Sequence, residues 1–298
     1  MFHHLRNVRG DARYRSGLDY LTHNFEADII VYNPKVMLSR LYSHVREYGV
    51  RDTAERLLCK SAHALLRSGF RKRDAPYLGE LAASASSVHV TADGLISALS
   101  PISGGDLQLL RREYEGYTAA LLERYKTVDL TYAAAFAIEE GSAFLMYALV
   151  RILRPSVVLE TGVANGHSSA FILNALAENG RGELHSVDVR HNVGNLVVDR
   201  QQWHLHLLDS SSLKKSLAAI VEQLPAIDLM VHDSDHSYQW MRHELETVFP
   251  RMSPCGVLAC DDANICYGMI DFCAAHNMKP LLLLEKRKVF AVLPLTSR

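Results

Sequence analysis

One stretch constrains the fold more than any other: residues 157–169, V-V-L-E-T-G-V-A-N-G-H-S-S. Its leading apolar residues, two of them β-branched, predict a short buried strand that Glu160 closes. Gly162 and Gly166 bracket a tight turn, and one of the two final serines is expected to cap the helix that follows. A strand–turn–helix unit presents backbone N–H groups at the carboxyl edge of a sheet, where open α/β folds bind nucleotide-like ligands.

The spacing of the glycines excludes two common phosphate-binding loops. A dinucleotide fingerprint requires G-x-G-x-x-G, whereas the glycines here form G-x-x-x-G behind an acidic residue. No lysine follows at the position that a P-loop requires. A glycine turn of this kind can also be a plain strand–helix connection, so its meaning depends on the rest of the chain.

Composition narrows the class of protein. The chain has 298 residues, 48% hydrophobic and 22% charged, which is typical of a globular protein with one large domain or a domain and an extension. A net charge of -1 favours neither nucleic acid nor an anionic membrane as a partner. The apolar run at residues 133–150 is interrupted by Glu139 and Glu140, so no membrane span is expected. Five cysteines without C-x-x-C spacing or a signal peptide predict reduced thiols in the cytoplasm and no structural zinc.

The first part of the chain, residues 1–130, is predicted to be a mainly helical extension. Apolar residues recur at helical spacing over residues 36–65, and a polar amphipathic helix is expected over residues 106–125. Between them, two β-prone runs within residues 87–99 flank Asp93-Gly94, which predicts a β-hairpin.

Strands and helices alternate over residues 131–298, the predicted catalytic domain. A helix is expected over residues 134–153, before Pro155. Strands are expected at residues 157–160, 184–188, 203–208, 227–232 and 257–260. Two last runs, at 281–284 and 289–292, are too close for a crossover helix and must pair antiparallel. The predicted fold class is α/β, with a Rossmann-like doubly wound sheet that ends in an antiparallel hairpin.

The pattern E-x-G-x-x-x-G-x-S that starts at Glu160 resembles motif I of class I S-adenosylmethionine methyltransferases, particularly the catechol O-methyltransferase branch. A parallel sheet ending in an antiparallel hairpin is also the arrangement of that family, and NAD-binding Rossmann domains lack it. The resemblance covers roughly residues 135 to 298 and implies S-adenosylmethionine as cofactor. It implies that the loop backbone around Glu160, Gly162 and Gly166 packs against the methionine part, and that Ser168 helps to hold its carboxylate.

Acidic residues at the next two strand ends extend the predicted cofactor site. Asp188 ends the second strand about 20 residues after the glycine turn, where an acidic side chain can accept both ribose hydroxyls. Asp209 and Ser210 end the third strand, at the position where the family contacts adenine. The alternatives are a surface aspartate at 188 and ordinary turn chemistry for the Asp-Ser pair.

A dense polar cluster, H-D-S-D-H-S-Y at residues 232–238, resembles the D-x-D-H-x-Y segment of macrocin- and novobiocin-type sugar O-methyltransferases and cephalosporin-hydroxylase-like proteins. Asp233, Asp261 and Asp262 follow neighbouring strands and are expected to converge beside the cofactor, and Asp233 is also predicted to contact the cofactor itself. Carboxylates about 4 Å apart repel by roughly 4 kcal/mol per pair, so one must be protonated or a cation must be present. The resemblance assigns Mg²⁺ to these three residues; the alternative is that they cap helices.

The predicted function is a Mg²⁺-dependent O-methyltransferase that acts on a hydroxylated small molecule, a sugar or another natural product. Asp235 matches the general base of the novobiocin-type enzymes, and His236 competes with it because its unperturbed pKa is near neutrality. The alternatives are a metal-independent methyltransferase that uses either residue, and a cofactor-binding protein without turnover. His204 and His206 share a strand face without acidic neighbours in the sequence and are interpreted as packing. In relatives, extensions like residues 1–130 form acceptor lids or dimer contacts, so a homo-oligomer is expected.

Overall fold

A computed structural model of the protein describes residues 75–100, 103–132, 137–285 and 288–295. Contacts divide the chain into two compact units, and the described residues belong to the unit made of residues 70–132 and 136–298. The helices predicted over residues 36–65 lie outside the described residues.

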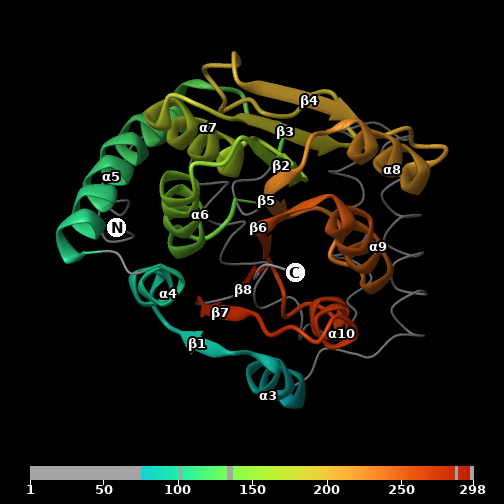
Figure 1. The fold of residues 1–298 in the computed structure, drawn as a ribbon. Helices are drawn as coiled ribbons and strands as arrows, with labels where there is room; N and C mark the ends of the chain where they lie inside the picture. Colours follow the sequence, from blue (N-terminus) through green and yellow to red (C-terminus); the bar gives the residue numbers. More distant parts are fainter. Residues whose placement is uncertain (1–74, 101–102, 133–136, 286–287, 296–298) are drawn as a thin grey trace, which may run out of the picture. The chain divides into compact units, whose positions relative to one another are not determined.

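An eight-stranded sheet forms the centre of this unit (Figure 1). Its strands are β1 (Ser87–His89), β2 (Val157–Thr161), β3 (Glu183–Asp188), β4 (Trp203–Leu207), β5 (Ile227–His232), β6 (Met252–Cys260), β7 (Leu281–Leu284) and β8 (Val289–Pro294). The order across the sheet is β1-β7-β8-β6-β5-β2-β3-β4, and β8 runs antiparallel to both of its neighbours while the other pairs are parallel. The predicted α/β fold, a doubly wound sheet ending in an antiparallel hairpin, is confirmed.

Helices cover both faces of the sheet. They are α3 (Ala75–Ser84), α4 (Ala92–Leu99), α5 (Gly104–Thr127), α6 (Glu140–Leu153), α7 (His167–Asn179), α8 (Leu213–Gln223), α9 (Tyr238–Val248) and α10 (Gly268–Ala275). In Figure 1, α4 to α7 lie on one side of the strands and α8 to α10 on the other. None of the helices in the described ranges combines the length and apolarity needed to cross a membrane.

Alternation along the central strands builds a core on each face. On β2, Val158 belongs to the core beneath α6 and α7, whereas Val157 and Leu159 belong to the core beneath α8, α9 and α10. Because both faces are buried, the strand reads as a continuous apolar run rather than an alternating one. Full burial of each such side chain contributes about 1.5–3 kcal/mol to folding.

The β-hairpin predicted within residues 87–99 is wrong. Its first run does form a strand, β1, but this strand pairs in parallel with β7 at the sheet edge. Asp93 and Gly94 then lie in the first turn of α4, because the hydroxyl of Thr91 accepts a hydrogen bond from the backbone N–H of Gly94 (3.2 Å) and caps that helix. The preference of Asp-Gly for a hairpin turn is therefore outweighed by the helix cap at Thr91 and by the burial of Leu95 in the core.

The other predicted elements are present in the structure, but β6 begins five residues before its predicted start and α6 six residues after it. The amphipathic helix predicted at 106–125 is α5, which starts two residues earlier because Ser103 caps it. The helix before the glycine turn, α6, begins at Glu140, and residues 133–136 lie outside the description. Because Glu113 on α5 pairs with Arg151 on α6 at 3.0 Å, α5 is attached to the sheet unit. The domain boundary near residue 130 stays a prediction.

Candidate active site

The carboxyl ends of β2, β5 and β6 meet at one edge of the sheet. The backbone N–H of Asp233 donates to the carbonyl of Thr161 (2.9 Å), and the N–H of Asp261 donates to the carbonyl of His232 (2.9 Å). Each residue that leaves a strand is thus bonded to the last residue of the strand beside it. This stagger places the glycine turn and the acidic residues after β5 and β6 next to one another.

The glycine turn packs directly against the segment after β5. Gly162 has φ +83°, and a Cβ on it would lie 2.1 Å from the carbonyl oxygen of Asp233. Gly166 has φ +80° and is itself the residue that precedes α7, so the prediction that a serine caps this helix is wrong. Since Gly166 has no side chain to cap the helix, the N–H groups of its first turn remain available to an anionic ligand.

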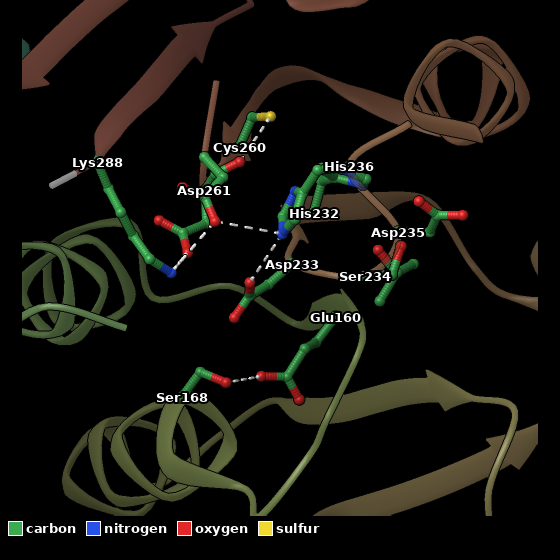
Figure 2. Close-up of polar contacts among 12 residues, drawn as sticks. Glu160, Ser168, His232, Asp233, Ser234, Asp235, His236, Cys260, Asp261 and Lys288 are labelled. Atoms are coloured by element: carbon green, nitrogen blue, oxygen red, sulfur yellow. Dashed lines mark hydrogen bonds and ion pairs between the residues drawn. The ribbon is translucent and has the colours of Figure 1, made fainter. Parts of the chain in front are cut away.

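Glu160 organises the interior of the turn. It is fully buried, and its carboxylate accepts hydrogen bonds from the hydroxyls of Ser168 (2.5 Å), Ser169 (2.6 Å) and Ser186 (2.7 Å). Burial raises the pKa of Glu160, and the serine hydroxyls oppose this effect. The carboxylate therefore ties the end of β2 to α7 and β3, and Figure 2 shows Ser168 directed at it. Whether these two residues also contact a cofactor stays a prediction.

Asp188 lies at the end of β3 beside the turn. Its Oδ2 accepts from the backbone N–H of Val163 (2.9 Å) and its Oδ1 from the N–H of Arg190 (2.9 Å). Each carboxylate oxygen can accept a further hydrogen bond, so these contacts leave capacity for ribose hydroxyls. Asp188 is partly exposed at the same edge as the turn, as its predicted role requires.

Asp209 and Ser210 lie at the end of β4 and are exposed. The carboxylate of Asp209 accepts from the backbone N–H of Ser211 (2.9 Å) and from the hydroxyls of Ser211 (2.8 Å) and Ser212 (2.9 Å). These hydrogen bonds, led by the backbone of Ser211, lower the pKa of Asp209. The pair therefore forms the turn before α8, and its contact with adenine stays a prediction.

Three carboxylates, those of Asp233, Asp261 and Asp262, gather at this edge; we refer to them as the acid group. Lys288, directly before β8, inserts its ammonium among them, 2.6 Å from Asp261 Oδ2 and 3.4 Å from Asp262 Oδ2 (Figure 2). Asp262 has φ +50°, a conformation that few residues other than glycine adopt and that often marks a functional site.

The two candidate bases are placed differently. The Nε2 of His236 lies 3.7 Å from Asp233 Oδ1 and 3.6 Å from Asp262 Oδ2, inside the acid group. Asp235 accepts the backbone N–H of Ser237 (2.9 Å) at the start of α9, and Figure 2 shows it apart from the other carboxylates. The structure thus brings His236 to the acid group and leaves Asp235 beside it.

Burial dominates the electrostatics of the acid group. Burial and the carboxylate of Asp261 raise the pKa of Asp233 well above its usual range. Burial lowers the pKa of His236 well below its usual range, and His232 and Lys288 act in the same direction. Burial alone would lower the pKa of Lys288, but the surrounding carboxylates raise it overall.

The acid group has the donor chemistry for a hard divalent cation. Asp261 is fully buried, and its Oδ1 has no hydrogen-bond partner within the described part of the chain. Three carboxylates against one ammonium leave negative charge that an ion would balance. As the chain stands, the imidazole of His236 lies between Asp233 and Asp262 and occupies part of that space. The residues therefore fit Mg²⁺ in their chemistry, but in the described part of the chain the three carboxylates are not all within 4.8 Å of one another, so an ion would have to draw them together.

Two important residues were not found from the sequence. Lys288 was one of several basic residues between two strands, but antiparallel pairing places the start of β8 beside the end of β6 and so at the active edge. Glu244 is fully buried and accepts from Thr161 (2.7 Å), His232 (2.5 Å), Ser234 (2.8 Å) and Trp240 (2.6 Å).

A sequence signal for Glu244 existed. It shares one helical face with Met241, Leu245 and Val248, so its burial on α9 could have been read from their spacing. His232 is fully buried and hydrogen-bonded to Glu244 through Nδ1, while its Nε2 has no partner among the described residues.

Residues 159–263, a little over a third of the chain, match a family model described as a methyltransferase domain. A comparison with curated proteins found no match.

The chain is also similar to three solved structures. An O-methyltransferase from Bacillus cereus in complex with SAH is 14% identical over 69% of this chain and 98% of its own, with a TM-score of 0.43. TomG from Streptomyces achromogenes, an O-methyltransferase in complex with SAM, is 13% identical over 69% and 96%, with a TM-score of 0.44. A methyltransferase from Geobacter sulfurreducens is 15% identical over 61% and 89%, with a TM-score of 0.44.

The matched segment runs from the middle of β2 through the acid group, and so contains both halves of the site. The sheet has the strand arrangement expected of class I methyltransferases, with the antiparallel last strand beside β6. The prediction from the sequence is therefore confirmed at this level: residues 159–263 match a methyltransferase domain, and the sheet around them has the predicted strand arrangement.

Proposed function

We propose that the chain is an S-adenosylmethionine-dependent O-methyltransferase that transfers a methyl group to a hydroxyl of a small molecule, a sugar or another natural product, with Mg²⁺ at the acid group. The observation that carries the proposal is the contact between the glycine turn and the segment after β5, where Gly162 leaves no room for a Cβ beside Asp233. A cofactor on the turn would therefore have its reactive end next to the carboxylates.

The residues of the turn would bind and orient the cofactor. The first turn of α7 offers N–H groups to an α-carboxylate, and Asp188 offers acceptors to ribose hydroxyls. When bound, S-adenosylmethionine supplies an electrophilic methyl group, which leaves sulfur and forms a bond to the acceptor oxygen. The hydroxyl proton must leave at the same time, and a nearby side chain must take it.

His236 is the proposed proton acceptor. Its Nε2 faces the carboxylates of Asp233 and Asp262, which would favour the imidazolium formed when the proton arrives, against the burial that lowers the pKa of the resting ring. Asp235 stays the second candidate, because its carboxylate is close in sequence and holds the start of α9. The matching family motif favours Asp235, and the geometry favours His236.

The three carboxylates of the acid group would hold Mg²⁺, which when bound lowers the pKa of an acceptor hydroxyl and fixes its position. Lys288 supports a second candidate, a metal-independent enzyme on the same fold. Its ammonium already neutralises Asp261 at 2.6 Å and would supply a fixed positive charge at the acceptor.

The first test is cofactor binding by isothermal titration calorimetry. S-adenosylmethionine and S-adenosylhomocysteine should both bind, and Asp188→Asn should weaken binding by about 1.5–3 kcal/mol, as expected for hydrogen bonds to a charged acceptor. Asp228→Asn is the matched control, because Asp228 also accepts two backbone N–H groups, those of Ser156 and Val157, but at the opposite end of β2. No binding of either compound, or equal losses in both variants, would contradict the proposed site.

The second test is turnover, measured as S-adenosylhomocysteine release over a panel of hydroxylated sugars and natural products. Activity should disappear in EDTA and return with Mg²⁺ or Mn²⁺. Full activity in EDTA together with inactive Lys288→Met would select the metal-independent enzyme. The residue whose variant, His236→Gln or Asp235→Asn, loses roughly 10²–10⁴-fold in turnover is the base. If the chain binds the cofactor but releases no S-adenosylhomocysteine with any acceptor of the panel, the alternative of a cofactor-binding protein without turnover is supported.

A further inference from the structure

A second group of possible metal ligands lies on the outer strands of the sheet, β3 and β4. Glu183 and His185 are two residues apart on β3, and His204 and His206 are two residues apart on β4. Side chains two apart on a strand share a face, and His185 is paired in register with His204. The acidic neighbour that the sequence did not show for these histidines therefore comes from the adjacent strand.

The carboxylate of Glu183 is spaced from both imidazoles as in a metal site. The Nε2 of His185 lies 3.6 Å from Glu183 Oε2, and the Nε2 of His204 lies 3.4 Å from the same oxygen. In the described ranges of the chain, these three residues are the group whose ligand atoms all lie within 4.8 Å of one another. In a tetrahedral Zn²⁺ site with bonds of about 2.0–2.1 Å, ligand atoms are about 3.3–3.5 Å apart.

His206 supports the orientation of His185. Its Nε2 lies 3.0 Å from the Nδ1 of His185, and the two rings are stacked with centroids 5.3 Å apart. In the tautomer in which the Nδ1–H of His185 donates to His206, the Nε2 of His185 keeps its lone pair for an ion. A histidine ligand whose other nitrogen is held by a hydrogen bond is the usual arrangement in metal sites.

The group is accessible and separate from the active edge. The side chains of His204 and Glu183 are 44% and 57% exposed, so an ion and a completing water molecule can reach them. On β3, His185 is the member of the group nearest to Asp188, and it lies three residues from that predicted ribose contact, about 10 Å along the strand. Figure 1 shows β3 and β4 together at the outer edge of the sheet.

We propose that Glu183, His185 and His204 form a binding site for a Zn²⁺-class transition-metal ion, with His206 as the residue that positions His185. Two imidazoles and one carboxylate suit Zn²⁺, Ni²⁺ or Cu²⁺, whereas Mg²⁺ prefers oxygen ligands alone. The site therefore differs in ion preference from the acid group, and it does not depend on the proposed methyltransferase activity.

The experiment is a Zn²⁺ titration of the full-length chain after removal of bound metal, in competition with a chromophoric chelator and in excess Mg²⁺. The chain should bind Zn²⁺ despite the Mg²⁺, and His204→Ala should weaken the tightest site by at least about tenfold. His191→Ala, which removes another exposed imidazole after β3, is the matched control and should bind as the unaltered chain does. Equal isotherms for the two variants, or no tight Zn²⁺ binding at all, would overturn the proposal.

A second measurement does not depend on the folding of a variant. Co²⁺ added to the unaltered chain should give the intense visible absorption of a tetrahedral site, and Zn²⁺ should remove it. In NMR spectra of the histidine rings, Zn²⁺ should shift the resonances that disappear in His204→Ala and His185→Ala. Shifts confined to other histidines would place the ion elsewhere and refute this site.

Discussion

His167, the first residue of α7, makes the folded state sensitive to acid. Its Nδ1 lies 2.8 Å from the hydroxyl of Tyr125, and its ring packs edge-on against Phe171. Burial lowers the pKa of His167 to about 4. In the unfolded chain the pKa is about 6.5, so between these two values the unfolded state binds more protons, and stability falls as pH falls.

The expected contribution of His167 is about 2 kcal/mol, reduced from the full linkage value because the ring keeps some exposure. It is fully present above pH 6.5 and is lost progressively as pH falls towards 4. Urea unfolding at several pH values should show that His167→Gln has a flatter dependence over this window, whereas His191→Gln, at an exposed loop position, follows the unaltered chain. Parallel curves for all three proteins would contradict this assignment.

Residues that follow strands were the predictable part of the candidate site. Asp188 ends β3, and Asp233 and Asp261 come directly after β5 and β6, so each could be placed from the local sequence that predicts the end of a strand. Lys288 could not be identified in the same way, because its position depends on the antiparallel register between β8 and β6, which pairs Cys260 with Ala291. A residue such as Lys288, which balances the charge of the carboxylates, is thus placed by strand pairing between distant parts of the sequence.

At the scale of elements, the glycine turn shows how backbone and site depend on one another. Gly162 is at φ +83° with its missing Cβ against the Asp233 carbonyl, so a side chain there is both strained and in collision. Gly116, on the exposed side of α5, has nothing within 4 Å of a Cβ. The same substitution is therefore expected to have opposite effects at the two positions.

We expect Gly116→Ala to raise the free energy of unfolding by about 0.5–1 kcal/mol, because alanine favours a helix. Gly162→Ala should lower it by several kcal/mol, on the order of the cost of overpacking plus backbone strain, and should abolish cofactor binding. Chemical denaturation and calorimetric titration of both variants provide the measurement. A Gly162→Ala chain that binds cofactor normally would show that the turn is not part of the site.

The type of each element, helix or strand, was predicted better than the neighbouring elements that it contacts in the fold. The strands and the final hairpin were recognised from apolar runs, because burial of β-branched residues is a strong local signal. The failure at Asp93-Gly94 and the capping of α7 by Gly166 arose where two local interpretations compete and tertiary contacts decide. For the same reason the sequence did not show which residues are neighbours across two strands. The histidines of β4 were therefore interpreted as packing, whereas the structure places Glu183 beside His204.

At the scale of the molecule, the contacts separate residues 70–132 and 136–298 from the remaining unit. A chain that starts at residue 70 should therefore fold on its own. Its thermal transition should be cooperative and within about 4 °C of the full-length value, since a change of 1 kcal/mol shifts a domain of this size by about 2–4 °C. Calorimetry should also find its affinity for S-adenosylmethionine unchanged.

The same chain tests the predicted role of the extension. If residues 1–69 contribute to an acceptor lid, turnover should fall while cofactor affinity is retained; if they make oligomer contacts, sedimentation should show a smaller assembly. Broad, non-cooperative unfolding or loss of cofactor binding would contradict the independence of the unit.

The position of β8 has a consequence for how the protein is made. In the described sheet β8 is the last strand in sequence, yet it lies between β7 and β6, so β1 and β7 reach the other strands only through it. It also follows Lys288, which neutralises Asp261. Folding can begin while the chain emerges from the ribosome. Until β8 has emerged, the sheet is therefore incomplete beside β6, and the carboxylate of Asp261 lacks the positive charge of Lys288. A nascent chain interrupted before residue 288 would expose buried carboxylates and two unattached strands, and would be a ready substrate for quality control.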